Sequence, residues 1–291
     1  MQHLVDTNNF SDVQIEQLLS DAKNFKTQCP PKLLRDKLLI TLFFEASTRT
    51  RSSFEVAAKR LGAAVVHLDP SRSSTKKGES LEDTFANLCA MEPDGVIIRH
   101  AQNETPQILA DMQTTPVINA GAGNYAHPTQ ALLDLFTMVE HFGDVKGKTI
   151  AIVGDIVSSR VASSGIRLMK RMGMHVILVA PKQFMPQSDL PQYEKLENVM
   201  DKVDVIMSLR AQLERHETEL FEDYEDYARQ YCITKERMQD RDILLLHPGP
   251  VMRNIDISDD MLEDPRCKVL TQVKNGVFMR MAILKLLLLD A

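Results

Sequence analysis

The fold of this chain is decided by one stretch, Phe43-Phe44-Glu45-Ala46-Ser47-Thr48-Arg49-Thr50-Arg51-Ser52-Ser53-Phe54-Glu55. An apolar run, Leu38 to Phe44, leads into it and is typical of a strand buried on both faces of a parallel sheet. A helix with one apolar face is predicted to follow, because apolar residues recur at i, i+3, i+4 and i+7: Phe54, Ala57, Ala58 and Leu61.

The ends of this helix also have sequence signals. Ser52 and Glu55 have the three-residue spacing of a capping box, which would begin the helix there. Gly62 is expected to end it, because glycine readily adopts the left-handed conformation that follows many helices.

The polar residues between the strand and the helix predict a phosphate site. Hydroxyl groups and the guanidinium groups of Arg49 and Arg51 stand beside the unpaired N–H groups of a helix N-terminus, and together they suit a tetrahedral dianion. An ordinary helix cap is the alternative, because Ser and Thr are common there. A cap leaves both arginines unexplained, since cations are unfavourable at the positive end of a helix dipole.

The residues Ser47-Thr48-Arg49-Thr50-Arg51 after an apolar strand resemble the carbamoyl-phosphate loop of the aspartate/ornithine carbamoyltransferase family. Later motifs extend the resemblance over nearly the whole chain. It implies that four residues hold the phosphate: Ser47, Thr48, Arg49 and Thr50. It also implies a homotrimer with active sites shared between subunits.

Size and composition predict a soluble protein of two domains. The 291 residues suffice for two domains of ordinary size, and 44% of them are hydrophobic and 25% charged. The net charge of −6 argues against nucleic acid as a partner, and it requires any anion site to gather its cations locally.

Cysteine usage and the ends of the chain indicate a cytoplasmic protein. The four cysteines lack C-x-x-C spacing and are expected to be reduced thiols, neither paired nor zinc-bound: Cys29, Cys89, Cys232 and Cys267. The N-terminal residues lack the apolar core of a signal peptide, and Ile283–Leu289 is expected to be a core-facing helix, too short to cross a membrane. No metal or organic cofactor is expected, because no residues cluster with metal-ligand spacing.

Alternating apolar runs and helical patterns predict an α/β fold of two doubly wound parallel sheets. Strands are expected at 38–44, 63–68, 95–99 and 117–119, and again at 149–153, 175–179, 203–208 and 243–246. Further helices are expected at 81–91 and 105–112, and at 11–28, an amphipathic helix with these residues on its apolar side: Val13, Ile15, Leu18, Leu19, Ala22 and Phe25.

The helix Pro128–Phe142 is predicted to join the two domains as a hinge, with four residues on its buried side: Leu132, Leu133, Phe136 and Val139. The expected domains are 1–128 and 129–276. The resemblance adds that a final helix, from about Val277, returns to the first domain.

A long polar loop, Asp69 to Ser80, follows the second strand. A solvated surface loop is as consistent with its composition as a mobile lid is. The family match implies that Ser73 and Lys77 reach the active site of a neighbouring subunit, with Lys77 contacting both substrates.

Two strand ends of the first domain carry further candidates. Arg99-His100 ends one strand, where ligands collect in open α/β sheets, although an arginine there is often a surface ion pair. His127-Pro128-Thr129-Gln130 follows the next strand, and a single histidine is more often a satisfied polar residue than a catalyst. The family match implies that Arg99 and His127 bind the carbonyl oxygen of carbamoyl phosphate, Arg99 also its phosphate, and Gln130 its amide. We assign His100 a structural role.

Motifs in the second domain predict the second substrate. Val153-Gly154-Asp155 has one of the three glycines of a dinucleotide fingerprint, so that function is excluded. Arg160 could be a surface residue, but the resemblance implies that it holds the α-carboxylate of aspartate. Arg210 and Gln212 lie two apart in an extended segment, face the same side and suit a planar carboxylate clamp. The resemblance assigns them the β-carboxylate of aspartate, because the Ser-Met-Gly segment that ornithine carbamoyltransferases have in this part of the second domain is missing here.

His247-Pro248-Gly249-Pro250 follows an apolar strand and predicts a rigid turn with exposed carbonyls. The resemblance implies that the carbonyls of Pro248 and Gly249 accept hydrogen bonds from the carbamoyl amide. Gly249 replaces the leucine of the family's better-known version.

We therefore predict an enzyme that transfers the carbamoyl group of carbamoyl phosphate to the α-amine of L-aspartate, the committed step of pyrimidine (UMP) synthesis. The catalytic residues implied by the resemblance are Arg49, Thr50, Lys77, Arg99 and His127. The alternatives are a carbamoyltransferase for another amine and a non-catalytic phosphate sensor. Regulatory chains or other enzyme partners are not predicted from the sequence.

Overall fold

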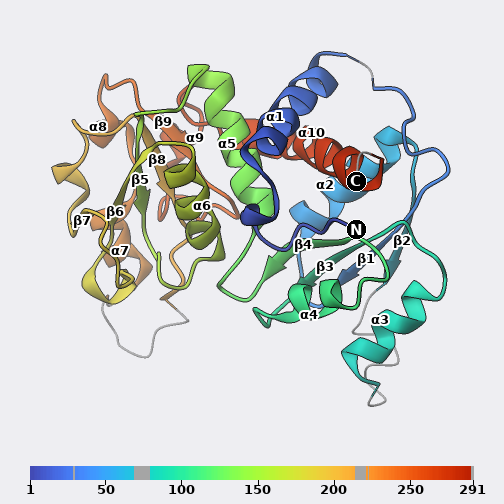
Figure 1. Ribbon diagram of the computed structural model, residues 1–291. Coiled ribbons are helices and arrows are strands. Elements are labelled where there is room, and N and C mark those ends of the chain that lie inside the picture. Colours follow the sequence, from blue (N-terminus) through green and yellow to red (C-terminus); the bar gives the residue numbers. More distant parts are fainter. Residues whose placement is uncertain (29, 69–78, 214–220, 222, 290–291) are drawn as a thin grey trace. The chain divides into compact units, whose positions relative to one another are not determined.

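The computed structural model describes residues 1–291 except 29, 69–78, 214–220, 222 and 290–291. The chain divides into two compact units (Figure 1). Unit 1 is Met1–Phe136 with Val273–Ala291, and unit 2 is Thr137–Gln272. The chain passes from one unit to the other within helix α5 (Pro128–Phe142) and returns at helix α10 (Val269–Leu288).

Unit 1 is built on a parallel sheet with the strand order β2-β1-β3-β4. The strands are β1 (Leu38–Phe43), β2 (Ala64–Leu68), β3 (Gly95–His100) and β4 (Val117–Ala122). The helices are η1 (Thr7–Asn9), α1 (Asp12–Thr27), α2 (Thr48–Leu61), α3 (Leu81–Cys89) and α4 (Thr105–Asp111). Apart from its first residue, β1 is buried, as its uninterrupted apolar run predicts.

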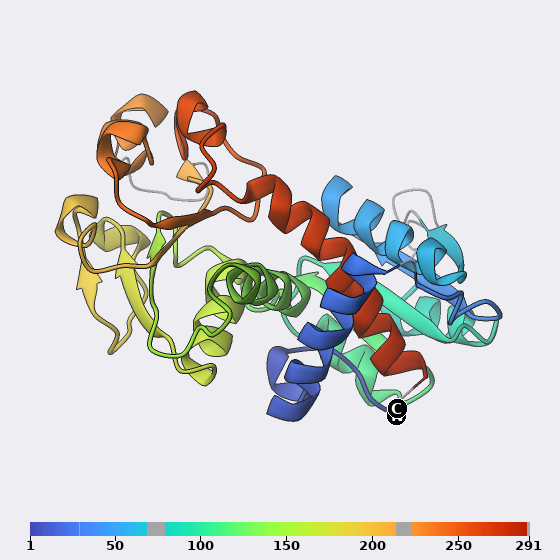
Figure 2. The same cartoon turned by 90° about the horizontal axis from the view of Figure 1, so that it is seen from above.

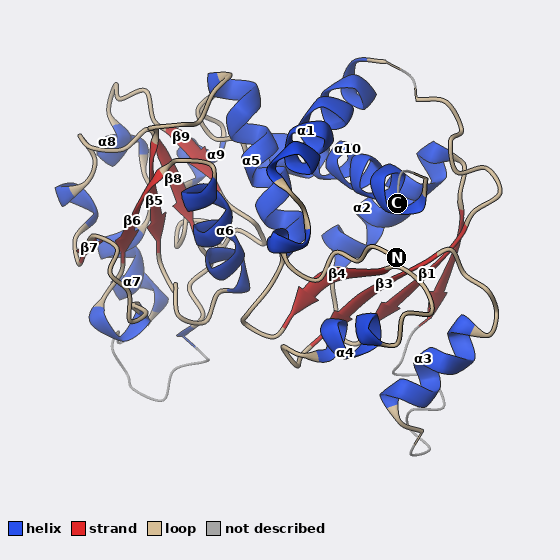
Figure 3. Cartoon of the chain, in the orientation of Figure 1, coloured by secondary structure: helices blue, strands red, loops and turns tan. Residues whose placement is uncertain are grey.

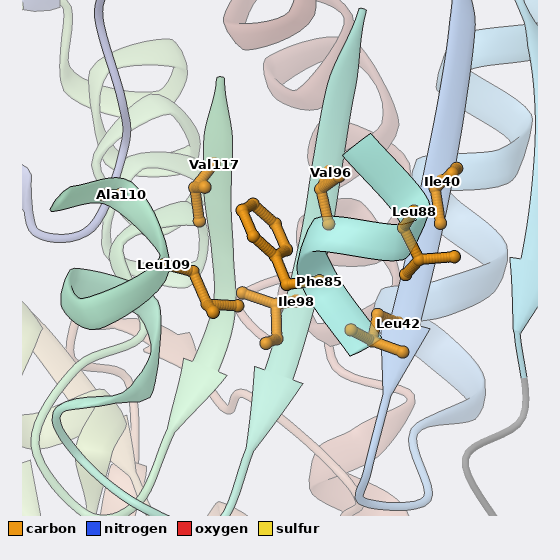
Figure 4. Packing of buried hydrophobic residues seen from close by; sticks show 9 residues of the cluster. All are labelled: Ile40, Leu42, Phe85, Leu88, Val96, Ile98, Leu109, Ala110 and Val117. Carbon is orange, nitrogen blue, oxygen red and sulfur yellow. The ribbon is translucent and has the colours of Figure 1, made fainter. Parts of the chain in front are cut away.

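Helices cover both faces of this sheet (Figure 3). On one face, side chains from three strands pack with α3 and α4 in a single cluster (Figure 4): Ile40, Leu42, Phe85, Leu88, Val96, Ile98, Leu109, Ala110 and Val117. On the other face, α2 buries its whole predicted apolar stripe: Phe54, Ala57, Ala58 and Leu61. Gly62 ends α2 with a left-handed backbone (φ 91°), as predicted.

Unit 2 repeats the plan with the strand order β7-β6-β5-β8-β9, also parallel. The strands are β5 (Thr149–Val153), β6 (His175–Val179), β7 (Gln192–Tyr193), β8 (Val205–Ser208) and β9 (Leu244–Leu246). The helices are α6 (Arg160–Arg171), η4 (Lys182–Phe184), η5 (Leu196–Asn198), α7 (Tyr224–Tyr231), α8 (Lys235–Met238) and α9 (Asp259–Leu262). Parallel strands joined through helices, seen from above in Figure 2, confirm the predicted α/β class.

Three helix predictions are wrong in detail. The capping box of Ser52 and Glu55 does not form, because α2 begins one turn earlier and Glu55 binds Lys59 instead (2.6 Å). The last helix begins at Val269, about two turns before the predicted start. Val13, expected on the apolar side of α1, is 74% exposed.

Among the residues that the structure describes, no helix combines the length and apolarity needed to cross a bilayer. Cys89, Cys232 and Cys267 are free thiols, and burial raises the pKa of each, that of Cys232 to about 11. They are therefore protonated at neutral pH and poor nucleophiles. Cys29 lies outside the described residues.

Candidate functional site

Each sheet has one point at which successive crossovers lead to opposite sides. In unit 1 this switch point lies between β1 and β3, because β2 pairs with the far edge of β1. In unit 2 it lies between β5 and β8. Ligands of open α/β sheets bind at the carboxyl ends of the strands that flank such a point. Several predicted site residues follow those strand ends, while His127 and Gln130 follow β4, and Pro248 and Gly249 follow β9.

The N-terminus of α2 follows β1 at the unit 1 switch point. Ser47 is its N-cap residue, yet the Ser47 side chain makes no capping hydrogen bond. Thr50 is buried within the first turn, at 7% exposure. Partial burial lowers the pKa of the Arg49 guanidinium, although the residue as a whole is exposed. Hydroxyls, main-chain N–H groups and a cation thus gather in one helical turn, which suits an anion.

Arg51 has a partner within the protein that its sequence position did not predict. Its Nη1 lies 2.8 Å from Nε2 of His67, whose Nδ1 lies 2.9 Å from Oγ1 of the buried Thr41. Because a guanidinium only donates, Nε2 accepts and Nδ1–H donates to Thr41. This chain of hydrogen bonds ties α2 to β2 and β1, and it removes part of the case for Arg51 as a second phosphate ligand.

Arg99, at the end of β3, lies beside the turn that leads into α2. Its Nε donates to Glu45 (3.1 Å), and its Nη1 donates to the carbonyl of Ala120 (3.5 Å). The Arg99 side chain is 14% exposed, so Glu45 fixes one edge of a largely buried guanidinium. His100 accepts from the amide of Gln102, and burial lowers its pKa, which fits the structural role assigned to it.

His127 and Gln130 are buried at the start of α5, which follows β4. Nε2 of Gln130 donates to Oδ1 of the buried Asp134 (2.9 Å). This bond orients the amide and leaves its oxygen, Oε1, as an acceptor suited to an N–H donor. In the loop before His127, the space beside Gly123 is occupied by the side chain of Asn103.

In unit 2, Arg160 is the first residue of α6, which follows β5. Ser159 caps this helix by accepting from the amide of Ala162 (3.2 Å). The preceding loop is held by the buried Asp155, which accepts from the amide of Ser158 (3.2 Å). As at α2, a cation stands at the positive end of a helix, which favours an anionic ligand.

Arg210 and Gln212 follow β8, and both are half-buried while Ala211 between them is fully buried. The turn of Pro248 and Gly249 follows β9. Gly249 has φ 71°, in the left-handed region that favours glycine over leucine, and the Gly249–Pro250 peptide bond is cis.

The structure places the two sets of predicted residues after the carboxyl ends of parallel strands, each set within its own unit. In unit 1 these are Ser47, Thr48, Arg49, Thr50, Arg99, His127 and Gln130; in unit 2 they are Arg160, Arg210, Gln212, Pro248 and Gly249. Ser73 and Lys77 lie outside the described residues. Sequence reasoning missed the carboxylates that orient these side chains, Glu45 and Asp134, although an acidic residue beside a strand end or in an apolar helix face is a usable signal.

Two parallel-sheet units, each with arginines at its switch point, are the features of an α/β protein suited to two anionic ligands. Within the described residues, no group of three His, Cys, Asp or Glu side chains is arranged to hold a metal. Two family models match the chain: the carbamoyl-P binding domain of aspartate/ornithine carbamoyltransferase over residues 2–140, and the Asp/Orn binding domain over 146–287. The chain belongs to the aspartate/ornithine carbamoyltransferase family.

Individual relatives match over their full length. The chain is 84% identical to the aspartate carbamoyltransferase catalytic subunit of a Sulfurovum species, covering 100% of this chain and 99% of the relative. It is 57% identical to that of a Nitratiruptor species, covering 99% of each. Among solved structures, the catalytic subunit of M. jannaschii aspartate transcarbamoylase superposes with a TM-score of 0.89 at 33% identity, covering 100% of this chain and 99% of that one. The Trypanosoma cruzi enzyme in complex with carbamoyl phosphate and aspartate has a TM-score of 0.88 at 32% identity, covering 97% and 95%.

The Ser47 hydroxyl makes no capping hydrogen bond, and its role can be tested by substitution. Ser47→Ala should change the free energy of unfolding by less than about 0.5 kcal/mol, because no capping bond is lost. It should weaken inhibition by inorganic phosphate, because the hydroxyl is available to an anion. Ser11→Ala is the matched control, since Ser11 caps α1 in a capping box with Gln14 and its loss should cost about 1 kcal/mol. Urea unfolding and phosphate inhibition measure both effects. A large loss of stability in Ser47→Ala with unchanged phosphate inhibition would assign the hydroxyl to the fold.

Proposed function

We propose that this chain catalyses the transfer of the carbamoyl group of carbamoyl phosphate to the α-amine of L-aspartate, giving N-carbamoyl-L-aspartate and phosphate. One observation carries the proposal: arginines stand at the switch points of both sheets, with hydroxyls in unit 1 and with an extended Arg-x-Gln segment in unit 2. The first arrangement suits a phosphate, and the second suits a carboxylate. A phosphate sensor would need only the first.

Unit 1 is assigned to carbamoyl phosphate. Ser47, Thr48, Arg49 and Thr50 would bind the phosphate, and Thr50, Arg99 and His127 would donate to the carbonyl oxygen, which becomes negative as the amine attacks. Losing one donor of this kind usually costs roughly 3–4 kcal/mol of activation free energy. The Gln130 oxygen and the carbonyls of Pro248 and Gly249 would accept from the carbamoyl amide.

Unit 2 is assigned to aspartate, with Arg160 on the α-carboxylate and Arg210 and Gln212 on the β-carboxylate. The neutral α-amine forms the new C–N bond, and the C–O bond to phosphate breaks. The departing phosphate accepts the amine proton, since the residues assigned to both substrates include no carboxylate as a general base. We place the reaction in pyrimidine synthesis and in the cytoplasm, with no cofactor in the reaction.

The direct test is a panel of acceptors. With carbamoyl phosphate, the purified protein should carbamoylate L-aspartate and should give at least a hundredfold lower kcat/KM with L-ornithine, because a cationic side chain would face Arg210. A colorimetric assay for ureido products, read against a reaction without protein, measures this. Equal rates with ornithine would favour the alternative of a different acceptor, and no product from any amine would favour the phosphate sensor.

Reciprocal arginine variants test the assignment of the two units. Arg210→Ala should raise the KM for aspartate by roughly tenfold to a hundredfold and leave inhibition by inorganic phosphate unchanged. Arg49→Ala should abolish phosphate inhibition and lower kcat/KM for carbamoyl phosphate by more than about tenfold. Each variant is the other's control, and circular dichroism checks that both fold. If Arg210→Ala weakens both substrates equally, Arg210 has a structural role.

We also propose a homotrimer in which Ser73 and Lys77 of one subunit complete the site of its neighbour; this rests on the resemblance of the sequence. Lys77→Ala and His127→Ala should each be nearly inactive. When equal amounts are unfolded and refolded together, about three quarters of the trimers contain both chains, and each mixed trimer has one complete site. Activity per mass should therefore recover to roughly a quarter of the unmodified protein. Trimers of native size without recovery would mean that Lys77 serves its own subunit.

A further inference from the structure

One buried carboxylate in unit 2 accepts hydrogen bonds from two segments that approach the candidate site, the segment after β8 and the segment after β9. Asp256 is 1% exposed, and its Oδ1 accepts from the amide of Ala211 (3.1 Å). Its Oδ2 accepts from the amide of Met252 (2.8 Å) and from Nε2 of His247 (3.1 Å). The Asp256 carbonyl accepts from the amide of Ile233 (3.0 Å), which fixes its backbone to the rest of unit 2.

His247 extends this network to the turn after β9. Its Nδ1 accepts from the amide of Gly249 (2.8 Å), so the proton is on Nε2 and is donated to Asp256. The amide of His247 donates to Oε1 of Gln272 (2.9 Å). The side chains of His247 and Asp256 are both 0% exposed, so neither can contact a ligand.

The two bonded amides determine where the proposed ligand groups point. The N–H of Gly249 shares a planar peptide with the carbonyl of Pro248, and in a trans peptide the two point in opposite directions. Anchoring that N–H to His247 therefore turns the Pro248 carbonyl away from the interior. The N–H of Ala211 is anchored in the same way, between Arg210 and Gln212.

We propose that Asp256, acting directly on Ala211 and through His247 on Gly249, is a positioning residue that sets the carboxylate clamp and the carbamoyl-amide acceptors as one rigid group. The inference rests on the proposed function of Arg210, Gln212 and Pro248. Position 256 requires a carboxylate, because all three groups that face the Asp256 side chain are hydrogen-bond donors. An asparagine would turn its NH₂ group toward at least one of them and leave a buried donor unpaired.

Asp256→Asn is the principal variant. It should raise the KM for aspartate and lower kcat, each by roughly tenfold to a hundredfold, the value of a charge-assisted hydrogen bond. Inhibition by inorganic phosphate, which we assign to unit 1, should not change. His247→Gln should lower kcat with a smaller rise in the KM for aspartate, because the bond of Asp256 to Ala211 is retained.

Asp204→Asn is the matched control. Asp204 also accepts a main-chain amide, that of Thr149 (2.8 Å), and a cation, Lys148 (2.8 Å), but at the amino ends of β5 and β8, whereas the candidate site is at their carboxyl ends. It should lower the stability of unit 2 and leave the KM for aspartate unchanged. A rise in KM in Asp204→Asn equal to that in Asp256→Asn would overturn the inference, because any destabilised unit 2 would then give it.

A double-mutant cycle separates positioning from general stability. In the Arg210→Ala background, Asp256→Asn should change the KM for aspartate by less than about threefold, because Arg210, the charged member of the clamp that Asp256 positions, is gone. An equal factor in both backgrounds would overturn the inference, as would an aspartate KM in Asp256→Asn that matches the unmodified protein.

Hydrogen exchange gives a readout that does not depend on activity. The amides of Ala211 and Gly249 should both exchange at least tenfold faster in Asp256→Asn and at an unchanged rate in Asp204→Asn. Unchanged exchange in Asp256→Asn would overturn the coupling even in an active enzyme. Conversely, if the unmodified protein transfers no carbamoyl group to aspartate, the proposed function fails while the exchange rates still report the coupling.

Discussion

The fold of unit 1 depends on the burial of β1 on both faces and along both edges. An apolar strand that pairs with β2 on one edge and with β3 on the other must send successive crossovers in opposite directions. The carboxyl ends of β1 and β3 are then left uncovered by a connection, and the N-terminus of α2 opens beside them. Unit 2 reaches the same arrangement between β5 and β8. The places for two ligands follow from packing before any particular side chain is considered.

An acidic protein that binds anions must stabilise cations where the field of a helix opposes them. The structure does this with local partners: Glu45 holds Arg99 at the end of β3, and the neutral His67 holds Arg51 at the edge of the sheet. Arg49 is left beside the hydroxyls of the first turn. Each partner fixes one side of a guanidinium group, which lowers the conformational entropy lost when an anion binds.

Buried carboxylates orient main-chain amides and neutral side chains, just as the partners above orient the arginines. Asp134 orients the amide of Gln130. Asp256 binds the Arg210–Ala211 peptide directly and the Pro248–Gly249 peptide through His247. A buried carboxylate is stable only when its oxygens accept several hydrogen bonds, so each one fixes all of its donors together. Preorganisation of this kind matters most in an enzyme whose catalysis rests on orientation and on charge stabilisation.

The sequence by itself determined most of the strands of both sheets and the α-helices of unit 1. The apolar runs predicted all the strands except β7, whose two residues form no run, and the spacing of Phe54, Ala57, Ala58 and Leu61 predicted the buried stripe of α2. These signals are local, because the periodic spacing of apolar residues in a strand or helix depends only on neighbouring sequence positions. The tertiary structure alone decided the true start of α2, the pairing of Arg51 with His67, and the burial of Asp256 among donors from the segments after β8 and β9. Those features depend on which distant segments the sheet order places side by side, and no local period encodes that order.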